Sequence, residues 1–247
     1  MLGSDLVHYL SPKFRITGIE KANYLRFVGR TFDIVINANG NSKRFWANQN
    51  PVDDFIASTV SVYKSIFDFN PNVYIYISSS DVYENHSNIS TTQETQSINP
   101  NNLSVYGFNK YLSEMIVKKY AYNYLILRSS MILGKELRKG PFYDVMNNKP
   151  LYITADSKLQ LITTKELANI ISFLISKRIY KEVFNVGGVG SFSFQNIQQY
   201  FNDEIKYSKN GEKQNYEMNV EKMNKLFTLK TSDEYLQEFL KTNNLLS

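Results

Sequence analysis

The stretch Ile77-Ser-Ser-Ser-Asp-Val-Tyr83 ends an apolar segment that begins at Val73, and Tyr106-Gly-Phe-Asn-Lys110 follows with 27 residues from Ser79 to Tyr106. An uninterrupted apolar segment is typical of a strand buried on both faces. In open α/β sheets, ligands bind beyond the carboxyl ends of the strands, which is where these serines fall. We therefore expect Ser79 to border a ligand site, although a polar strand end that leads into a turn would give the same pattern.

Tyr106 and Lys110 lie four residues apart in a stretch, 103–121, whose pattern predicts a helix, so both side chains would share one helix face. An ammonium group beside a phenol favours the phenolate and lowers the phenol pKa, which suits acid–base catalysis. The spacing alone is weak. Tyr9 and Lys13 repeat it with Pro12 in between and no strand before them, and an ordinary helix-surface pair is the alternative for Tyr106 and Lys110.

Short apolar runs alternate with helical patterns along the whole chain, which predicts an α/β fold with a mostly parallel sheet. Further strands are expected at 14–19, 33–37, 124–128 and 183–186. Further helices are expected at 52–68, 165–176, 192–201, 220–227 and 232–243. Ser232 and Tyr235 provide only half of a capping box for the last helix. The polar segment 84–100 is expected to be a long surface loop.

Composition excludes several classes of protein. The 247 residues suit one domain, or one domain with a smaller lobe. The absence of cysteine and the presence of only His8 and His86 argue against a disulfide framework and a metal site. A net charge of +5 without a basic cluster argues against nucleic acid as a partner. Without an apolar run of membrane-spanning length or a signal peptide, we expect a cytoplasmic protein that does not bind membranes.

Taken together, these stretches resemble the extended short-chain dehydrogenase/reductase family, the NAD-dependent sugar epimerases and dehydratases. Ser78 to Tyr83 resembles the family pattern S-S-x-x-V-Y, and Tyr106 to Lys110 resembles Y-x-x-x-K. Four further segments resemble family motifs in the same order: Asp33 to Gly40 (DVVINAAG), Leu127-Arg128 with Gly134 (LR…YG), Phe184 to Gly188 (FNVGSG) and the C-terminal segment from Val220 to Leu236. The resemblance therefore spans nearly the whole chain.

The resemblance implies catalytic roles for four residues. Tyr106 would be the acid–base group on a sugar hydroxyl, and Lys110 would lower its pKa and hold the nicotinamide ribose. Ser79 would hydrogen-bond the reacting oxygen while hydride passes between the sugar carbon and NAD. Asp81 stands where the 4,6-dehydratases carry a glutamic acid, but Ser80 stands where they carry an aspartic acid. This half-match favours an epimerase or a reductase, and a plain turn residue is the alternative for Asp81.

The resemblance also implies a cofactor site. Asn37, Ala38 and Asn39 would lie beneath the cofactor, with Ser130 joining Tyr106 and Lys110 around it. Gly3 resembles the last glycine of the phosphate-binding motif, and Glu20 would bind the adenosine ribose. A carboxylate there repels a 2′-phosphate, so NAD is favoured over NADP.

The chain departs from the family at both ends of the expected site. The earlier glycines and the first strand are absent, and the short separation of Glu20 from Asp33 leaves no room for a further strand. Either residues upstream of Met1 belong to the protein, or the chain is a shortened, inactive relative. Leu159 stands at the position of the arginine that meets the nucleotide diphosphate, and Met131 at that of an asparagine. The nearby cations Lys135, Arg138 and Lys139 would replace that arginine, unless they only form a solvated loop.

We therefore expect a Rossmann-like, doubly wound parallel sheet that lacks the usual first strand, with a small C-terminal substrate lobe. Residues 1–134 plus about 165–188 would form the cofactor domain, and about 135–164 plus 189–247 the substrate-binding lobe. The expected function is NAD(P)-dependent epimerisation or reduction of a sugar, and a nucleotide-linked sugar is the expected substrate. The alternative is an inactive relative that binds a sugar, a nucleotide or a protein. The resemblance implies a homodimer formed by the helices at 52–68 and 103–121.

Overall fold

A parallel sheet of four strands forms the centre of the computed structural model, which describes residues 1–41 and 43–244. The strand order is β1-β2-β3-β8, with the bounds Ile34–Asn37, Val73–Ser79, Tyr124–Ser129 and Glu182–Val186. Ile36 on β1 lies opposite Ile75 on β2, which in turn lies opposite Leu125 on β3. The prediction of a Rossmann-like parallel α/β sheet is confirmed.

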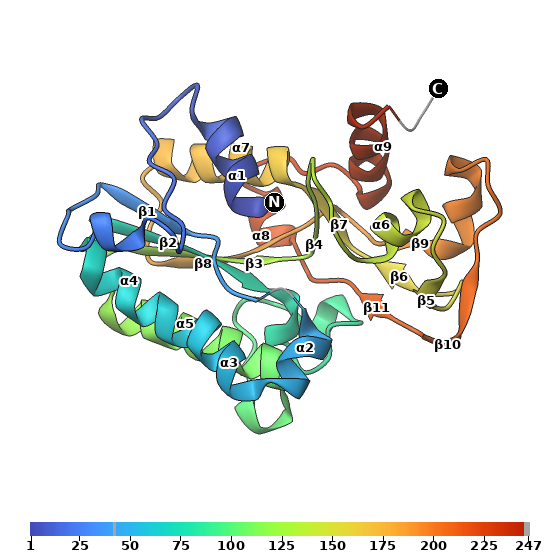
Figure 1. Cartoon of the computed structure of the whole chain (residues 1–247), viewed down its shortest axis with the longest axis horizontal. Helices are drawn as coiled ribbons and strands as arrows, with labels where there is room; N and C mark the ends of the chain where they lie inside the picture. The colour runs from blue at the N-terminus through green and yellow to red at the C-terminus, as the bar shows by residue number, and fades with distance from the viewer. Residues whose placement is uncertain (42, 245–247) are drawn as a thin grey trace.

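Helices cover both faces of this sheet (Figure 1). Above it in the view lie α1, α7 and α8, with the bounds Leu2–Leu10, Thr164–Ser176 and Glu221–Asn224. Below it lie α3, α4 and α5, with the bounds Pro51–Phe55, Ser61–Phe69 and Val105–Tyr120. Ile75 packs in the core on the α1–α7 side, whereas Tyr74 and Tyr76 pack against α4 and α5. Because alternate residues of β2 fill two different cores, the strand is apolar throughout.

A second apolar core lies beyond the sheet, at the right of Figure 1. Phe142, Phe192 and Phe194 are fully buried in it, together with Leu236 and Leu240. The elements around it are α6 (Pro141–Met146), α9 (Ser232–Thr242), β5 (Leu151–Ile153), β6 (Lys158–Leu159), β9 (Phe192–Ser193), β10 (Tyr207–Glu212) and β11 (Asn215–Tyr216). A parallel pair, β4 (Met131–Leu133) with β7 (Leu161–Thr163), lies between the two cores. This separate core supports our proposal that about 135–164 and 189–247 form a substrate lobe, except that Val220, Met223 and Leu229 pack in the core of the central sheet.

The strand expected at 14–19 is wrong. Phe14 and Ile16 are partly buried against the α1–α7 core, and Arg15 between them is exposed, but this segment pairs with no described strand. Alternate residues are therefore buried here without a hydrogen-bonded ladder, which a strand also needs for its backbone groups. Before β1, the described residues form only α1 and a short 3-10 helix, Tyr24–Arg26.

Three helix predictions need correction. The helix expected at 52–68 is divided by a π-helical segment, Ile56–Val60, and the one at 192–201 is β9 followed by the 3-10 helix Phe194–Tyr200. The helix expected at 220–227 is reduced to α8. A complete capping box begins α9, formed by Thr231 and Glu234. Ser232 does not cap this helix, because its hydroxyl donates to the carbonyl of Gly190 at 2.5 Å.

The segment 84–100 is attached to the rest of the fold, unlike the long surface loop that the sequence predicts. It contains a 3-10 helix, Ile89–Thr91, and the side chain of Thr92 is fully buried. The Thr92 hydroxyl accepts a hydrogen bond from the Asn219 backbone at 2.9 Å, which attaches the segment to the residues before α8. No helix in the described part of the chain is long and apolar enough to cross a membrane.

Candidate active site

Ser79, Tyr106 and Lys110 are brought together at the carboxyl end of β2. Ser79 is the last residue of β2, and Tyr106 lies in the first turn of α5. The helix begins there because the Ser104 hydroxyl accepts a hydrogen bond from the Gly107 backbone at 3.1 Å, a standard N-cap. Gly107 packs directly on the backbone of Asp81, so α5 approaches the end of β2 closely. This contact aligns one face of α5 with the end of β2.

Lys110 is a buried amine. Only 5% of the residue is exposed, and its Nζ donates to the carbonyl of Ile77 at 3.2 Å. The same nitrogen lies 5.2 Å from the ring centre of Tyr76 and 5.9 Å from that of Tyr106. Burial lowers the pKa of Lys110 to about 8, although the charges of Asp54, Glu114 and Asp81 act in the opposite direction. Lys110 is therefore mostly protonated at neutral pH, and it loses this proton at a lower pH than an ordinary lysine does.

Tyr106 does not behave as the Tyr/Lys spacing predicts. Burial raises the pKa of Tyr106, the charge of Asp81 raises it further, and a hydrogen bond from Ser79 offsets only part of this. The net shift is opposite to the one expected from Lys110 alone, because desolvation and the charge of Asp81 raise the phenol pKa. Tyr106 retains its proton and is placed to donate it.

Asp81 is held by three donors. Its Oδ2 accepts from the Ser79 hydroxyl at 3.0 Å, and its Oδ1 accepts from Arg44 Nη1 at 3.1 Å and from the Tyr216 hydroxyl at 3.3 Å. The ring of His86 stacks on Tyr216 with 3.9 Å between centroids, and burial lowers the pKa of His86. No sequence pattern pointed to Arg44 or Tyr216, which come from α2 (Arg44–Gln49) and β11.

The residues after β1 shape a turn at the same edge of the sheet. Asn37 is buried, and its amide donates to the Tyr74 hydroxyl at 2.7 Å and to the Ser65 hydroxyl at 3.3 Å. Its side-chain Oδ1 accepts a hydrogen bond from the backbone N–H of Asn39 at 3.1 Å. Ala38 is half-buried and Asn39 is exposed. Asn37 therefore fixes the backbone course of this turn.

The remaining cofactor predictions divide into two groups. Ser130 is buried after β3, next to Gly187, and its Oγ has no hydrogen-bond partner among the described residues. Tyr106 and Lys110 suit the polar nicotinamide ribose, and a role of Ser130 in holding it stays a prediction. Gly3 lies in the first turn of α1, where an added Cβ would meet nothing within 4 Å, and Glu20 is exposed in an irregular segment. The described residues thus fit the nicotinamide end of a dinucleotide and do not build a site for its adenosine end.

A buried polar network lies behind the site. Glu114, one turn after Lys110, accepts from the Ser78 hydroxyl at 2.6 Å and from Arg128 Nη2 at 2.8 Å. Both members of this ion pair are at most 2% exposed. Burial acts to lower the pKa of Arg128, but the Glu114 charge outweighs it and the pKa is raised. The network joins α5 to β2 and β3 immediately beside Ser79.

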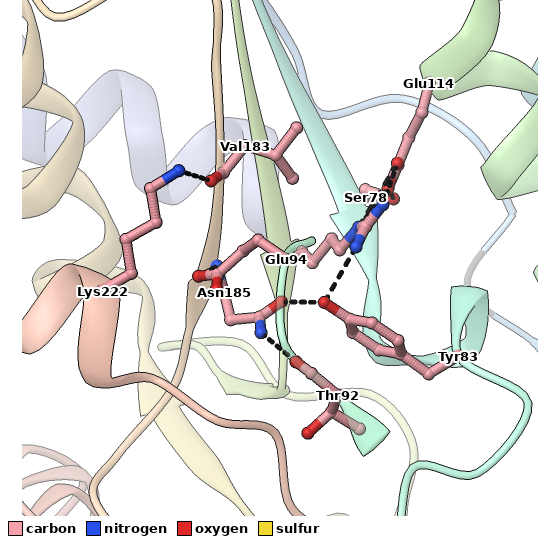
Figure 2. Close-up of polar contacts among 9 residues, drawn as sticks. Ser78, Tyr83, Thr92, Glu94, Glu114, Val183, Asn185 and Lys222 are labelled. Atoms are coloured by element: carbon pink, nitrogen blue, oxygen red, sulfur yellow. Dashed lines mark hydrogen bonds and ion pairs between the residues drawn. The ribbon is translucent and has the colours of Figure 1, made fainter. Parts of the chain in front are cut away.

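This network continues to the segment 84–100 (Figure 2). Arg128 Nη1 donates to the Tyr83 hydroxyl at 2.8 Å, and Tyr83 donates to Asn185 Oδ1 at 2.9 Å. The Asn185 amide then donates to the Thr92 carbonyl at 2.6 Å. A chain of satisfied polar groups thus connects four elements around the carboxyl edge of the sheet.

Among the residues that the structure describes, no three acidic or histidine side chains form a metal cluster.

Sequence comparison identifies the family. Residues 5–187 match the family model of the NAD dependent epimerase/dehydratase family. The chain belongs to this family. No curated protein matches the sequence. The match includes β1, β2, β3 and β8, and with them Ser79, Tyr106 and Lys110.

Solved structures of this family have the same fold at low sequence identity. A dTDP-4-dehydrorhamnose reductase from Bacillus anthracis, in complex with NADP, is 18% identical with a TM-score of 0.76, covering 98% of this chain and 94% of that one. A UDP-N-acetylglucosamine 4-epimerase from Methanobrevibacter ruminantium, in complex with UDP-N-acetylmuramic acid, is 16% identical with a TM-score of 0.76, covering 99% and 94%. A UDP-glucuronic acid 4-epimerase from Bacillus cereus, in complex with UDP-glucuronic acid and NAD, is 18% identical with a TM-score of 0.69, covering 85% and 76%.

The buried Lys110 predicts an unusual pH dependence of stability. Its pKa is about 8 in the folded chain against an ordinary 10.5, so the unfolded chain binds more protons between these values. Stability should therefore rise with pH across this window. Replacing Lys110 with methionine should remove that contribution and raise the free energy of unfolding at neutral pH by about 1–3 kcal/mol. Urea denaturation of both proteins at a series of pH values measures the difference.

Lys119→Met is the matched control, because Lys119 is an exposed lysine on the same helix. The pKa of Lys139 is also lowered to about 8, first by burial, but this residue is present in all three proteins and cancels. Equal pH profiles for Lys110→Met and Lys119→Met would show that Lys110 is not buried as described.

Proposed function

We propose that the chain is an NAD(P)-dependent epimerase or reductase that acts on a nucleotide-linked sugar. The observation that supports this most is the convergence of Ser79, Tyr106 and Lys110 at the carboxyl end of β2. Family membership provides the reaction class, and the structural relatives named above act on or bind dTDP- and UDP-linked sugars according to their descriptions.

The chain's own residues would position the sugar and move one proton. When bound, a nicotinamide cofactor supplies or accepts the hydride at the sugar carbon. The Ser79 hydroxyl, 3.0 Å from Asp81, would turn to hydrogen-bond the reacting oxygen. In the reducing direction, Tyr106 Oη would donate its proton to that oxygen. The phenolate left behind is then stabilised by the Lys110 ammonium.

The reducing direction starts from the protonated state of Tyr106, and the oxidising direction starts from its phenolate. A proton donor is needed to reduce a keto sugar, and Tyr106 is protonated as it stands. Oxidation of a hydroxyl requires the phenolate first, which burial and Asp81 disfavour. The chemistry of a keto-sugar reductase therefore fits the site with the least rearrangement.

For the cofactor we propose NAD, with NADP less favoured. Tyr106, Lys110 and Ser130 would hold the nicotinamide ribose. The turn at Asn37, Ala38 and Asn39 would lie beneath the cofactor. The preference for NAD depends on Glu20 alone, and Glu20 would have to move from its exposed position to reach an adenosine ribose.

A catalytically inactive relative is the second candidate. The open surroundings of Gly3 and the exposure of Glu20 favour it, because neither residue contributes to a built dinucleotide site. Such a chain would use the same edge of the sheet to bind a sugar, a nucleotide or a protein without turnover.

We also propose that the protein is a cytoplasmic homodimer. Large apolar side chains are exposed along the helices at 51–69 and 105–120, which supports pairing of this face with a second copy: Phe55, Ile56, Phe67, Phe108 and Met115. Light scattering on the purified chain should give the mass of a dimer, and a monomer at micromolar concentration would contradict this part of the proposal.

Titration with NADH and NADPH tests the function. We expect the chain to bind reduced nicotinamide cofactor, with enhanced cofactor fluorescence. Lys110→Met should weaken binding by about tenfold or more, because it removes a charged donor to the ribose. Lys119→Met, with the same loss of charge on the outer face of α5, should bind as the wild type does. Equal affinity of all three proteins for the reduced cofactor would show that Lys110 does not contact it.

A further inference from the structure

We propose that Arg44 forms an oxyanion-binding subsite beside Ser79, which receives a phosphate or carboxylate group of the substrate. This inference rests on the proposed function and adds a residue that reads the charge of the substrate. Arg44 is not one of the cations that the resemblance to the family suggested.

Arg44 lies one carboxylate away from Ser79. Its Nη1 donates to Asp81 Oδ1 at 3.1 Å, while Asp81 Oδ2 accepts from Ser79 at 3.0 Å. The Asp81 side chain is 14% exposed, but that of Arg44 is 47% exposed. A guanidinium has five N–H donors in a planar fork, so donors remain directed toward solvent next to the reacting groups. This geometry suits bidentate binding of an oxyanion.

The plane and position of Arg44 are fixed before any ligand arrives. The guanidinium carbon lies 5.8 Å from the ring centre of Tyr216, whose hydroxyl also donates to Asp81. Asn41 donates to the Lys43 carbonyl at 2.8 Å and to Asp54 Oδ1 at 2.9 Å. This anchors the start of α2. A fixed cation loses less conformational entropy on binding than a mobile surface side chain.

The anchor extends to α5. Asp54 is fully buried, and its Oδ2 accepts from the Asn109 amide at 2.7 Å. Asn109 directly precedes Lys110, so the turn that carries Lys43 and Arg44 is tied to the helix that carries Tyr106. The spacing between Arg44 and the acid–base group is therefore built into the fold.

The other cationic candidates fit less well. Leu159, at the family's arginine position, is 5% exposed in the core of the substrate lobe. Arg138 is 77% exposed on its side chain and forms an ion pair with Glu136 at 2.9 Å. It has no described contact with Ser79, Asp81 or Tyr216. Arg44 is thus the cation that the fold connects to the acid–base site.

Calorimetric titration with UDP, UDP-glucose and UDP-glucuronic acid tests the subsite. We expect Arg44→Gln to weaken binding by about tenfold or more. Arg138→Gln is the matched control, because it removes an exposed arginine that forms an ion pair with Glu136 and has no described contact with Asp81, and we expect affinities within about twofold of the wild type.

The three ligands separate the two sources of negative charge. If the subsite reads the diphosphate, Arg44→Gln weakens all three ligands equally. If it reads a carboxylate on the sugar, the variant selectively weakens UDP-glucuronic acid. Unchanged binding of all three, or an equal loss in Arg138→Gln, would overturn the subsite, as would a wild-type chain that binds none of them. NADH titration of the same proteins tests the proposed function separately from the subsite. A wild-type chain that does not bind NADH would contradict the proposed function, and the result with the UDP ligands would still stand.

Discussion

Replacing Arg128 with methionine should lower the free energy of unfolding by about 3–5 kcal/mol, because it leaves a buried carboxylate without its partner. Glu114 is completely buried and receives three close contacts from the Arg128 guanidinium, at 2.8, 3.0 and 3.3 Å. The substitution also removes the donor to the Tyr83 hydroxyl. Chemical denaturation of the variant and the wild type at neutral pH measures the loss.

The double variant Arg128→Met/Glu114→Leu is the control for this prediction. With both charges replaced by apolar side chains of similar size, most of the lost stability should return, because a buried ion pair contributes little beyond its own desolvation. The Ser78 hydroxyl then loses its acceptor, which should keep a deficit of about 1 kcal/mol. A single variant as stable as the wild type would mean that Glu114 reaches water, contrary to its burial.

Gly107→Ala should be the most damaging substitution of a glycine that the structure describes in a helix. A Cβ at Gly107 would overlap the backbone carbonyl oxygen of Asp81, and backbone on both sides leaves no flexible side chain to move. We expect a loss of about 3 kcal/mol in unfolding free energy. Cofactor affinity should fall as well, since α5 must shift away from the end of β2.

Gly3→Ala is the matched comparison for Gly107→Ala. Both glycines lie in the first turn of a helix, but a Cβ at Gly3 meets nothing within 4 Å. Because alanine favours helix more than glycine does, this variant should match the wild type or gain up to about 1 kcal/mol. Thermal and urea denaturation of the two variants measure the difference in their unfolding free energies. Equal losses of stability in the two variants would contradict the close packing of α5 on Asp81.

The central sheet could be predicted because its strands are buried on both faces. The segment from Val73 to Ile77 is apolar at every position, and only a covered central strand requires this. The segment from Phe14 to Ile19 has the alternation of a half-buried strand but no neighbour to pair with. Pairing is a property of the whole fold, so the local pattern could not reveal its absence.

The site could be predicted only where its residues follow a fixed spacing. Ser79 ends an apolar strand, and Tyr106 and Lys110 lie one helix turn apart, so a pattern could find them. Arg44 and Tyr216 reach Asp81 from segments that no spacing connects. The direction of the Tyr106 pKa shift also escaped the sequence, because it depends on burial and on the position of Asp81 in space.

The central claim is that Ser79, Tyr106 and Lys110 serve a bound nicotinamide cofactor. Energy transfer from Trp46 to NADH tests it most directly, because Trp46 is the only tryptophan and lies on α2 two residues after Arg44. The account predicts saturable quenching of tryptophan emission by NADH, reversed by excess NAD and weakened in Lys110→Met. Emission that is unchanged at millimolar NADH and NADPH, from a chain shown to be folded, would contradict it and favour the inactive relative.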